Sequence, residues 1–215
     1  IYAVTGASLA GAKAMTATAS AGYNYMQEGI GYAVASEIPC VILDVQRCRG
    51  ENFATQADVM QMRWGASGDH ELIVLAPSSV QELFDTMIRA FNLAERYRTP
   101  VVVMSDTTIA LMREKLVIPH ADDIQRVDRP RPQVPPEDFL PFKAEPNGVP
   151  PLPDFGEGYG ILHSLNPHDE EGSIHWDPDV FEALYDRITG KIAANYADVV
   201  ETEGFFLDDA EVGIV

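Results

Sequence analysis

The sequence contains little that is typical of a membrane protein, a secreted protein or an iron–sulfur protein. No apolar run approaches the roughly 20 residues that span a bilayer, and the first residues lack the basic and apolar regions of a signal peptide. There are only two cysteines, Cys40 and Cys48, and an iron–sulfur cluster needs four cysteine ligands. We therefore expect a cytoplasmic globular protein with two free thiols, in which Cys40 is a small buried hydrophobic residue.

Positive charge is scarce, with 15 Lys and Arg residues against 33 Asp and Glu residues. Residues 1–118 hold 12 acidic and 9 basic side chains, a net charge of −3, whereas residues 119–215 hold 21 and 6, a net charge of −15. An acidic surface of this kind repels nucleic acid and anionic membranes, so neither is expected as a partner. We interpret the acidic half as a solvated face, and binding of a basic partner is the alternative.

Several common catalytic and binding motifs are missing from the sequence. There is no GxSxG, no P-loop, no HExxH, and no GxGxxG after an expected strand. His163, His168 and His175 lie near acidic residues, but their spacing matches no compact metal-ligand pattern. We therefore expect no metal site in this chain and predict that these histidines are solvated.

An alternation of apolar strands and helices is present in the first half of the chain. The helix after Ser79 has a capping-box glutamate at Glu82 and an apolar face at helical spacing. Continuous apolar runs such as CVILDV are typical of strands that are covered on both sides. The pattern predicts an α/β fold with a mostly parallel sheet and helices on both faces. The expected strands are residues 12–18, 40–45, 71–77 and 100–106, and helices are expected at the start of the chain, at 23–36 and between 79 and 98.

Proline marks a change of character in the second half, because ten of the 15 prolines lie in residues 119–154. Proline fixes φ and removes a hydrogen-bond donor, so we expect an extended arm that Phe139, Leu140, Phe142 and Phe155 anchor to a neighbouring domain or subunit. A helix is expected over residues 178–195, and a strand-like run ends the sequence, which we take to be part of a longer protein. The expected units are residues 1–118, an α/β domain; 119–177, a proline-rich acidic linker; and 178–215, a helix and the start of a further domain.

Ligands of parallel sheets bind at the carboxyl ends of the strands. The end of the first expected strand carries four residues with small side chains or none. Thr18, Ala19, Ser20 and Gly22 lie where a strand meets a helix, which suits the close approach of a cofactor. A tight turn whose small residues serve packing explains the same pattern. Both interpretations remain open.

Arg47 follows the apolar strand that ends near Asp44, and a guanidinium there can bind a carboxylate through two hydrogen bonds. The alternative is a surface ion pair of Arg47 with Asp44 or Glu51. Asp44 itself, like Asp106, ends a strand and is either an acid–base group or a cap of the following turn.

Four segments resemble the alpha subunits of 2-oxoacid:ferredoxin oxidoreductases, in that family's order and closest to the 2-oxoglutarate type. The first two, GAKAMTATASAGYNYMQEGIGYAVASEIPCVILDVQR and GDHELIVLAPSSVQELFDTMIRAFNLAERYRTPVVVMSD, resemble the pyrimidine-binding domain of the thiamine-diphosphate-binding fold. PPEDFLPFKAEPNGVPPLPDFGEGY and FFLDDAEV resemble the segments that follow it.

The resemblance implies oxidative decarboxylation of a 2-oxoacid with coenzyme A and transfer of electrons to ferredoxin. It implies that thiamine diphosphate is shared with a beta subunit that carries the diphosphate-binding domain. It places magnesium and an iron–sulfur cluster on partner subunits and leaves room for gamma and delta subunits. The family's catalytic glutamate would precede Ile1, so no catalytic residue is assigned here. Arg47 matches the arginine that would hold the substrate carboxylate.

Two loops depart from the family pattern. Relatives carry Thr-Ser-Gly-Pro-Gly where this chain has residues 18–22, TASAG, and Gly-Gly-Pro-Ser-Thr-Gly where it has CRGENFATQ after Arg47. These departures leave two alternatives open: a non-catalytic structural or assembly subunit of the same fold, and a member specific for branched-chain 2-oxoacids.

Overall fold

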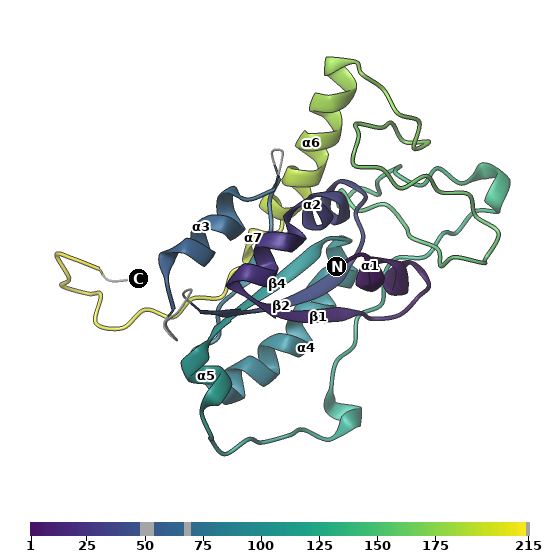
Figure 1. Cartoon of the computed structure of the whole chain (residues 1–215). Helices are drawn as coiled ribbons and strands as arrows, with labels where there is room; N and C mark the ends of the chain where they lie inside the picture. Colours follow the sequence, from purple (N-terminus) through teal and green to yellow (C-terminus); the bar gives the residue numbers. More distant parts are fainter. Residues whose placement is uncertain (48–53, 67–69, 214–215) are drawn as a thin grey trace.

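The structure is a computed structural model of the chain, and it describes residues 1–47, 54–66 and 70–213. Figure 1 shows a twisted sheet at the centre, with helices packed around it and a long irregular arm at one end. The strands are β1 (Met15–Ala19), β2 (Cys40–Gln46), β3 (Ile73–Leu75) and β4 (Pro100–Asp106). The helices are α1 (Tyr2–Leu9), α2 (Ser20–Ala35), α3 (Gln56–Trp64), α4 (Val80–Tyr97), α5 (Thr107–Leu111), α6 (Pro178–Ala193) and α7 (Tyr196–Val199).

The four strands are all parallel and are ordered β1-β2-β4-β3. Val41 of β2 packs with Val101 and Val103 of β4 against α4 on one face. Ile42 and Val102, one residue further along their strands, pack on the opposite face against Tyr23 of α2 and Met62 of α3. This alternation explains the uninterrupted apolar runs, since both faces of the sheet are covered. The predicted α/β fold with a parallel sheet and helices on both faces is confirmed.

Several predicted boundaries were displaced. The first strand begins at Met15, and α2 begins at Ser20. Of the small residues at this junction, Thr18 and Ala19 therefore end β1, and Ser20 and Gly22 lie in the first turn of α2. The third strand is only Ile73–Leu75, and α6 ends at Ala193. Helix α3 was not among the predicted helices. The expected strand at the end of the sequence is wrong, because residues 208–213 form turns and bends.

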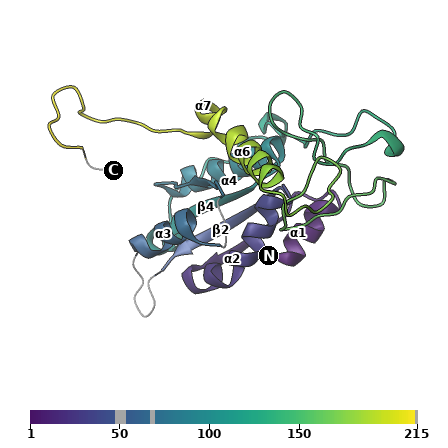
Figure 2. The ribbon, with the colours of Figure 1, turned by 90° about the horizontal axis from the view of Figure 1, so that it is seen from above.

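The proline-rich arm after α5 has little regular structure, with two short 3-10 turns at Ala121–Asp123 and Pro136–Asp138. Its aromatic residues Phe139 and Phe142 are buried within this chain, and Leu152 packs on Ala33 and Cys40. Phe155 stays 57% exposed. The arm therefore packs on its own sheet domain, whereas we had expected it to anchor on a neighbour. Figure 2 shows the arm folded back at one end and the C-terminal tail extending away from the body at the other.

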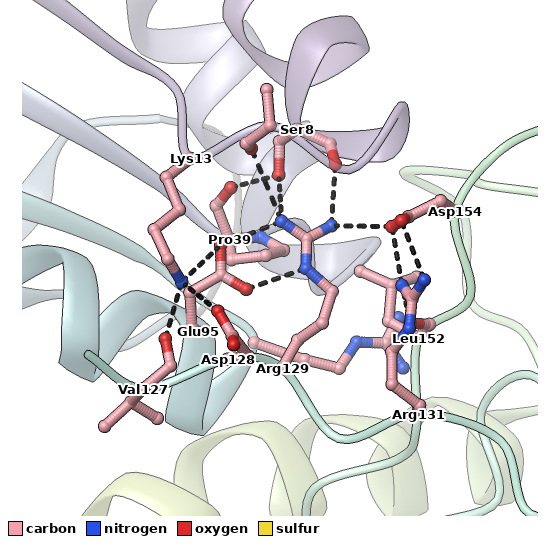
Figure 3. A network of polar contacts seen from close by, with 12 residues as sticks. Ser8, Lys13, Pro39, Glu95, Val127, Asp128, Arg129, Arg131, Leu152 and Asp154 are labelled. Atoms are coloured by element: carbon pink, nitrogen blue, oxygen red, sulfur yellow. Dashed lines mark hydrogen bonds and ion pairs between the residues drawn. The ribbon is translucent and has the colours of Figure 1, made fainter.

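A buried arginine fastens the arm to the first helix and to α4 (Figure 3). Arg129 donates from Nε and Nη2 to the two carboxylate oxygens of Glu95, at 2.7 and 2.8 Å, and from Nη1 to the carbonyl of Ser8 at 2.6 Å. Nearby, Arg131 forms two hydrogen bonds with Asp154. Buried charges need partners, so the bidentate pair of Arg129 and Glu95 fixes the arm against α4 at this point.

Helix α6 is held against the same domain by a second buried carboxylate. Glu37 is fully buried and accepts hydrogen bonds from Arg187 and Lys191 of α6. Although burial alone would raise it, the pKa of Glu37 is lowered to about 2 by Lys191 and Arg187. In the described parts of the chain, no helix is both long enough and apolar enough to cross a bilayer.

Candidate functional site

The carboxyl edge of the sheet brings together the ends of β1 and β2 and the first turn of α3. The Ser20 hydroxyl, at the start of α2, lies 2.6 Å from the carbonyl oxygen of Arg47 and 2.5 Å from Oδ2 of Asp58. The backbone N–H of Arg47 donates back to the Ser20 hydroxyl at 3.0 Å. Three elements thus converge on one serine side chain, because strands β1 and β2 pair in register up to Ala19 and Val45.

The chain passes directly from β1 into α2, and this junction is tightly packed. Gly22 lies so close to the Thr18 hydroxyl that a Cβ at position 22 would collide with it. Ala19 precedes α2 in an extended conformation, and its side chain makes no cap hydrogen bond. The contact between Gly22 and Thr18 therefore supports the explanation that these small residues serve packing. The role of Thr18, Ala19, Ser20 and Gly22 in cofactor binding stays a prediction.

Asp44 lies under this edge, in a setting that the sequence did not indicate. It is fully buried, and neither carboxylate oxygen has a hydrogen-bond partner in the described part of the chain. Burial, and then the nearby Asp58 carboxylate, raises the pKa of Asp44 to about 7. The Tyr23 hydroxyl is also buried with no partner among the described residues, and burial followed by the Asp44 charge raises its pKa. A carboxyl with so little compensation is characteristic of functional sites.

The structure separates the two aspartates that end strands. Asp106 caps α5 by accepting the N–H of Ile109 at 2.9 Å, as predicted. Asp44 caps nothing among the described residues, but the turn that follows its strand lies largely outside them, so its role as a cap stays a prediction. Nor does Asp44 pair with Arg47, because its oxygens are unpartnered. Cys48, Arg49 and Glu51, which follow Arg47 in this loop, lie outside the described residues, so the alternative pairing of Arg47 with Glu51 is not tested.

Arg47 stands at the carboxyl end of β2 with an exposed side chain, which suits a guanidinium that receives a ligand carboxylate. Its backbone is held by Ser20. Substrate binding by Arg47 stays a prediction, and its place at the ligand-binding edge of the sheet is consistent with it.

The histidines predicted to be solvated are mostly not. His168 is buried beneath Phe142, with ring centroids 4.0 Å apart, and its Nδ1 donates to the carbonyl of Asn166. Burial lowers the pKa of His168, and burial followed by the Arg98 charge lowers the pKa of His163 to about 4. Only His175, paired with Asp169, is in the expected setting. Throughout residues 1–47, 54–66 and 70–213, no three His, Cys, Asp or Glu side chains are arranged to hold a metal.

Comparison with known proteins shows the family of the chain. Residues 1–180 match the family described as pyruvate flavodoxin/ferredoxin oxidoreductase, thiamine diphosphate-binding. The chain belongs to this family. The buried Cys40 and the parallel sheet are thus parts of a thiamine-diphosphate-binding domain.

Curated relatives sharpen the comparison. The chain is 44% identical over 218 residues to the KorA subunit of 2-oxoglutarate synthase from Methanothermobacter thermautotrophicus, covering 99% of this chain and 57% of that protein. The Methanocaldococcus jannaschii KorA subunit is also 44% identical, over 100% of this chain and 58% of its own length. The VorB subunit of ketoisovalerate oxidoreductase from Methanothermobacter marburgensis is 42% identical over 54% of this chain and 34% of that protein.

One solved structure gives the same result in three dimensions. It is a 2-oxoglutarate:ferredoxin oxidoreductase from Magnetococcus marinus with 2-oxoglutarate, coenzyme A and succinyl-CoA bound. The TM-score is 0.81 at 27% identity, with 95% of this chain and 37% of that chain covered. The present chain thus spans a little over half the length of the curated KorA subunits and a smaller share of this enzyme chain.

Sequence reasoning singled out Arg47 at this edge but gave no attention to Asp58 and Tyr23, which the structure places near Asp44. Asp58 is in the first turn of α3, a helix that the polar composition of its segment concealed, and Tyr23 resembled an ordinary helix residue. A polar residue in an otherwise apolar strand, such as Asp44 in CVILDV, was the one available signal.

Proposed function

We propose that this chain is the pyrimidine-binding part of the alpha subunit of a 2-oxoacid:ferredoxin oxidoreductase whose substrate is 2-oxoglutarate. The complete enzyme would decarboxylate the acid oxidatively, form the coenzyme A thioester and pass two electrons to ferredoxin. The observation that carries this proposal is the extent of the match. The KorA subunits from Methanothermobacter thermautotrophicus and Methanocaldococcus jannaschii align with 99–100% of the chain, whereas the ketoisovalerate subunit aligns with 54%.

The described residues fit thiamine diphosphate as one side of a shared site. The turn at Thr18–Gly22 has no bulky side chain, and helix α2 begins there with N–H groups that no side chain caps. These features suit a flat ring that approaches closely, and we assign Thr18, Ala19, Ser20 and Gly22 to this side. Bound thiamine diphosphate supplies the electron sink for decarboxylation of the 2-oxoacid. We assign the diphosphate, magnesium and iron–sulfur groups to partner subunits.

Arg47 is the residue that we assign to the substrate. Its guanidinium stands at the ligand-binding edge of the sheet and can meet a carboxylate in a planar fork, which lysine cannot do. The role of the chain is then to orient the 2-oxoacid against the cofactor.

The remaining parts have proposed roles in assembly. Residues 1–118 form the cofactor-facing domain, residues 119–177 the linker, and residues 178–215 the connection to a further domain. The partners we propose are a beta subunit that carries the diphosphate-binding domain, gamma and delta subunits, and ferredoxin.

The test is an assay of the purified complex with the complete alpha subunit, measured as 2-oxoglutarate-dependent reduction of ferredoxin or a viologen dye. Arg47→Lys should raise the KM for the 2-oxoacid about tenfold or more, because a charge-assisted hydrogen bond contributes roughly 1.5–3 kcal/mol and each tenfold is about 1.4 kcal/mol. Arg49→Lys, two residues further along the chain, and Arg63→Lys, an exposed residue of α3, should leave the KM near the wild-type value. A crippled Arg49→Lys with a normal Arg47→Lys would contradict the assignment.

Specificity for branched-chain 2-oxoacids is the second candidate, because a ketoisovalerate oxidoreductase subunit is 42% identical over 120 residues. The same complex should be offered 2-oxoglutarate and ketoisovalerate side by side. A higher kcat/KM for ketoisovalerate would replace the 2-oxoglutarate proposal, and absence of turnover with any 2-oxoacid would favour a structural subunit.

A further inference from the structure

The peptide group between Gln46 and Arg47 is held at both of its polar atoms by side-chain hydroxyls. Its carbonyl oxygen, on Gln46, accepts a hydrogen bond from the Thr107 hydroxyl at 3.1 Å. Its N–H, on Arg47, donates to the Ser20 hydroxyl at 3.0 Å. Gln46 is the last residue of β2, so this peptide joins the sheet to the residue that we assign to the substrate.

The two hydroxyls come from the two strands that flank β2. Ser20 is the first residue of α2, directly after β1, and Thr107 is the first residue of α5, directly after β4. Both β1 and β4 pair with β2 in parallel, so the three strands end at the same edge of the sheet. The peptide that leads to Arg47 is therefore held from both sides, although β2 itself ends before it.

Thr107 is itself held in a fixed position. The residue before it, Asp106, pairs with Gln46 in the sheet, and the Asp106 carboxylate accepts the N–H of Ile109 at 2.9 Å. Ile109 is buried, which anchors the short helix α5. The threonine hydroxyl is thus presented by a backbone that is bound to the sheet before it and to the first turn of α5 after it.

A fixed peptide matters here because the Arg47 side chain is exposed and can adopt many rotamers. A peptide group is planar, so hydrogen bonds to its oxygen and to its N–H together fix the orientation of the whole group. That orientation limits the directions in which the Arg47 side chain can leave the backbone. A binding group that is oriented in advance loses less freedom when its ligand arrives.

We propose that Thr107 is a positioning residue, whose hydroxyl orients the Gln46–Arg47 peptide and so strengthens the binding of the substrate carboxylate by Arg47. This step rests on the proposed function, in which Arg47 binds the 2-oxoacid. The alternative is that the hydroxyl only satisfies a carbonyl group at the end of a strand. Its loss would then lower stability and leave substrate binding unchanged.

The first test removes the threonine hydroxyl in the complete complex. Thr107→Val keeps the branched shape of the side chain but has no donor, so the KM for 2-oxoglutarate should rise about three- to tenfold, the effect of losing one hydrogen bond. The kcat and the KM for coenzyme A should change little. Thr107→Ser, which keeps the hydroxyl, should restore the KM. Thr108→Val, at the exposed next position, is the matched control and should behave as the wild type.

A double-mutant cycle shows whether the effect of Thr107 passes through Arg47. In the Arg47→Lys background the guanidinium is absent, so adding Thr107→Val should raise the KM further by less than about twofold. If the two substitutions are instead fully additive, Thr107 acts independently of Arg47 and the proposal is overturned. An unchanged KM in Thr107→Val alone would overturn it as well.

Hydrogen exchange distinguishes failure of this proposal from failure of the proposed function. The Arg47 amide should exchange faster in Thr107→Val, and at the wild-type rate in Thr107→Ser and Thr108→Val. If exchange accelerates while Arg47→Lys leaves the KM unchanged, Thr107 does hold the peptide, but the substrate role of Arg47 fails. If Arg47→Lys raises the KM but Thr107→Val changes neither exchange nor KM, the positioning role of Thr107 fails alone.

Discussion

The buried carboxyl groups near the two ends of β2 differ in whether a cation compensates their charge. Before its first residue, Glu37 is fully buried and accepts hydrogen bonds from Arg187 and Lys191. Near its last residue, Asp44 is just as buried, but both of its oxygens lack partners among the described residues, and its charged neighbour is another carboxylate, Asp58. The pKa of Glu37 is lowered to about 2, and that of Asp44 is raised to about 7.

This difference separates a region held by paired charges from one with an uncompensated carboxyl. At the Glu37 end, paired charges join α6 to the domain. At the Asp44 end, an uncompensated carboxyl destabilises the native state when it is ionised, and it lies where ligands of parallel sheets bind. Substitutions at the two ends should therefore affect stability in opposite ways.

The largest effect is expected for Glu37→Gln. This change leaves Lys191 buried without its counter-ion, and breaking a buried pair costs about 3–5 kcal/mol. Urea unfolding of the complete subunit measures the loss. A loss below 1 kcal/mol would mean that the charges at this end are not coupled as the contacts indicate.

Arg129→Lys is expected to have the next largest effect. Lysine cannot reproduce the two parallel hydrogen bonds from Arg129 to Glu95, so stability should fall by roughly 1.5–3 kcal/mol, the contribution of a charged hydrogen bond. Proteolysis of the arm should become faster under native conditions. Unchanged cleavage would show that its aromatic residues alone hold the arm.

Asp44→Asn should make the protein more stable relative to the wild type, and this stabilisation should grow as the pH rises. An acid with a raised pKa binds its proton in the folded state but not in the unfolded state between pH about 4 and about 7, so wild-type stability falls with rising pH across that window. Asparagine does not titrate, so the free energy of unfolding of the variant should rise relative to that of the wild type by up to about 1.4 kcal/mol per pH unit in this window. Parallel unfolding curves at pH 5, 6 and 7 measure this gain. A constant difference would contradict the raised pKa.

The smallest effect is expected for Arg96→Ala, which removes a partly exposed ion pair with Asp198. Exposed pairs contribute about 0.2–1 kcal/mol, and salt screens them. The difference from the wild type should shrink further in 0.5 M salt. A loss of stability as large as that of Glu37→Gln would show that the exposed Arg96–Asp198 pair contributes as much as the buried pairs of Glu37.

Local pattern was enough to predict much of the first half of the chain. The apolar runs at Cys40–Gln46 and Pro100–Asp106, the capped helix α4 and the buried Cys40 all followed from periodicity and composition. Helix α3 and the start of α2 were missed because their polar or small residues have weak periodicity.

The arm shows where local pattern fails. Its prolines correctly indicated a lack of regular structure, but they carried no information about the surface that it would meet. Phe142 contacts His168, and Arg129 contacts Glu95 and Ser8, through pairings between segments that are far apart in the chain.

The sequence by itself determined the parallel α/β architecture, the buried strands and the place of Arg47 at a strand end, because these depend on the spacing of apolar residues over a few turns or strands. Only the tertiary structure decided which buried charges are compensated. Glu37 accepts hydrogen bonds from the cations of α6, whereas Asp44 and Asp58 lie near each other with no cation between them among the described residues. Such electrostatic environments depend on distances between groups remote in sequence, and no local pattern encodes them.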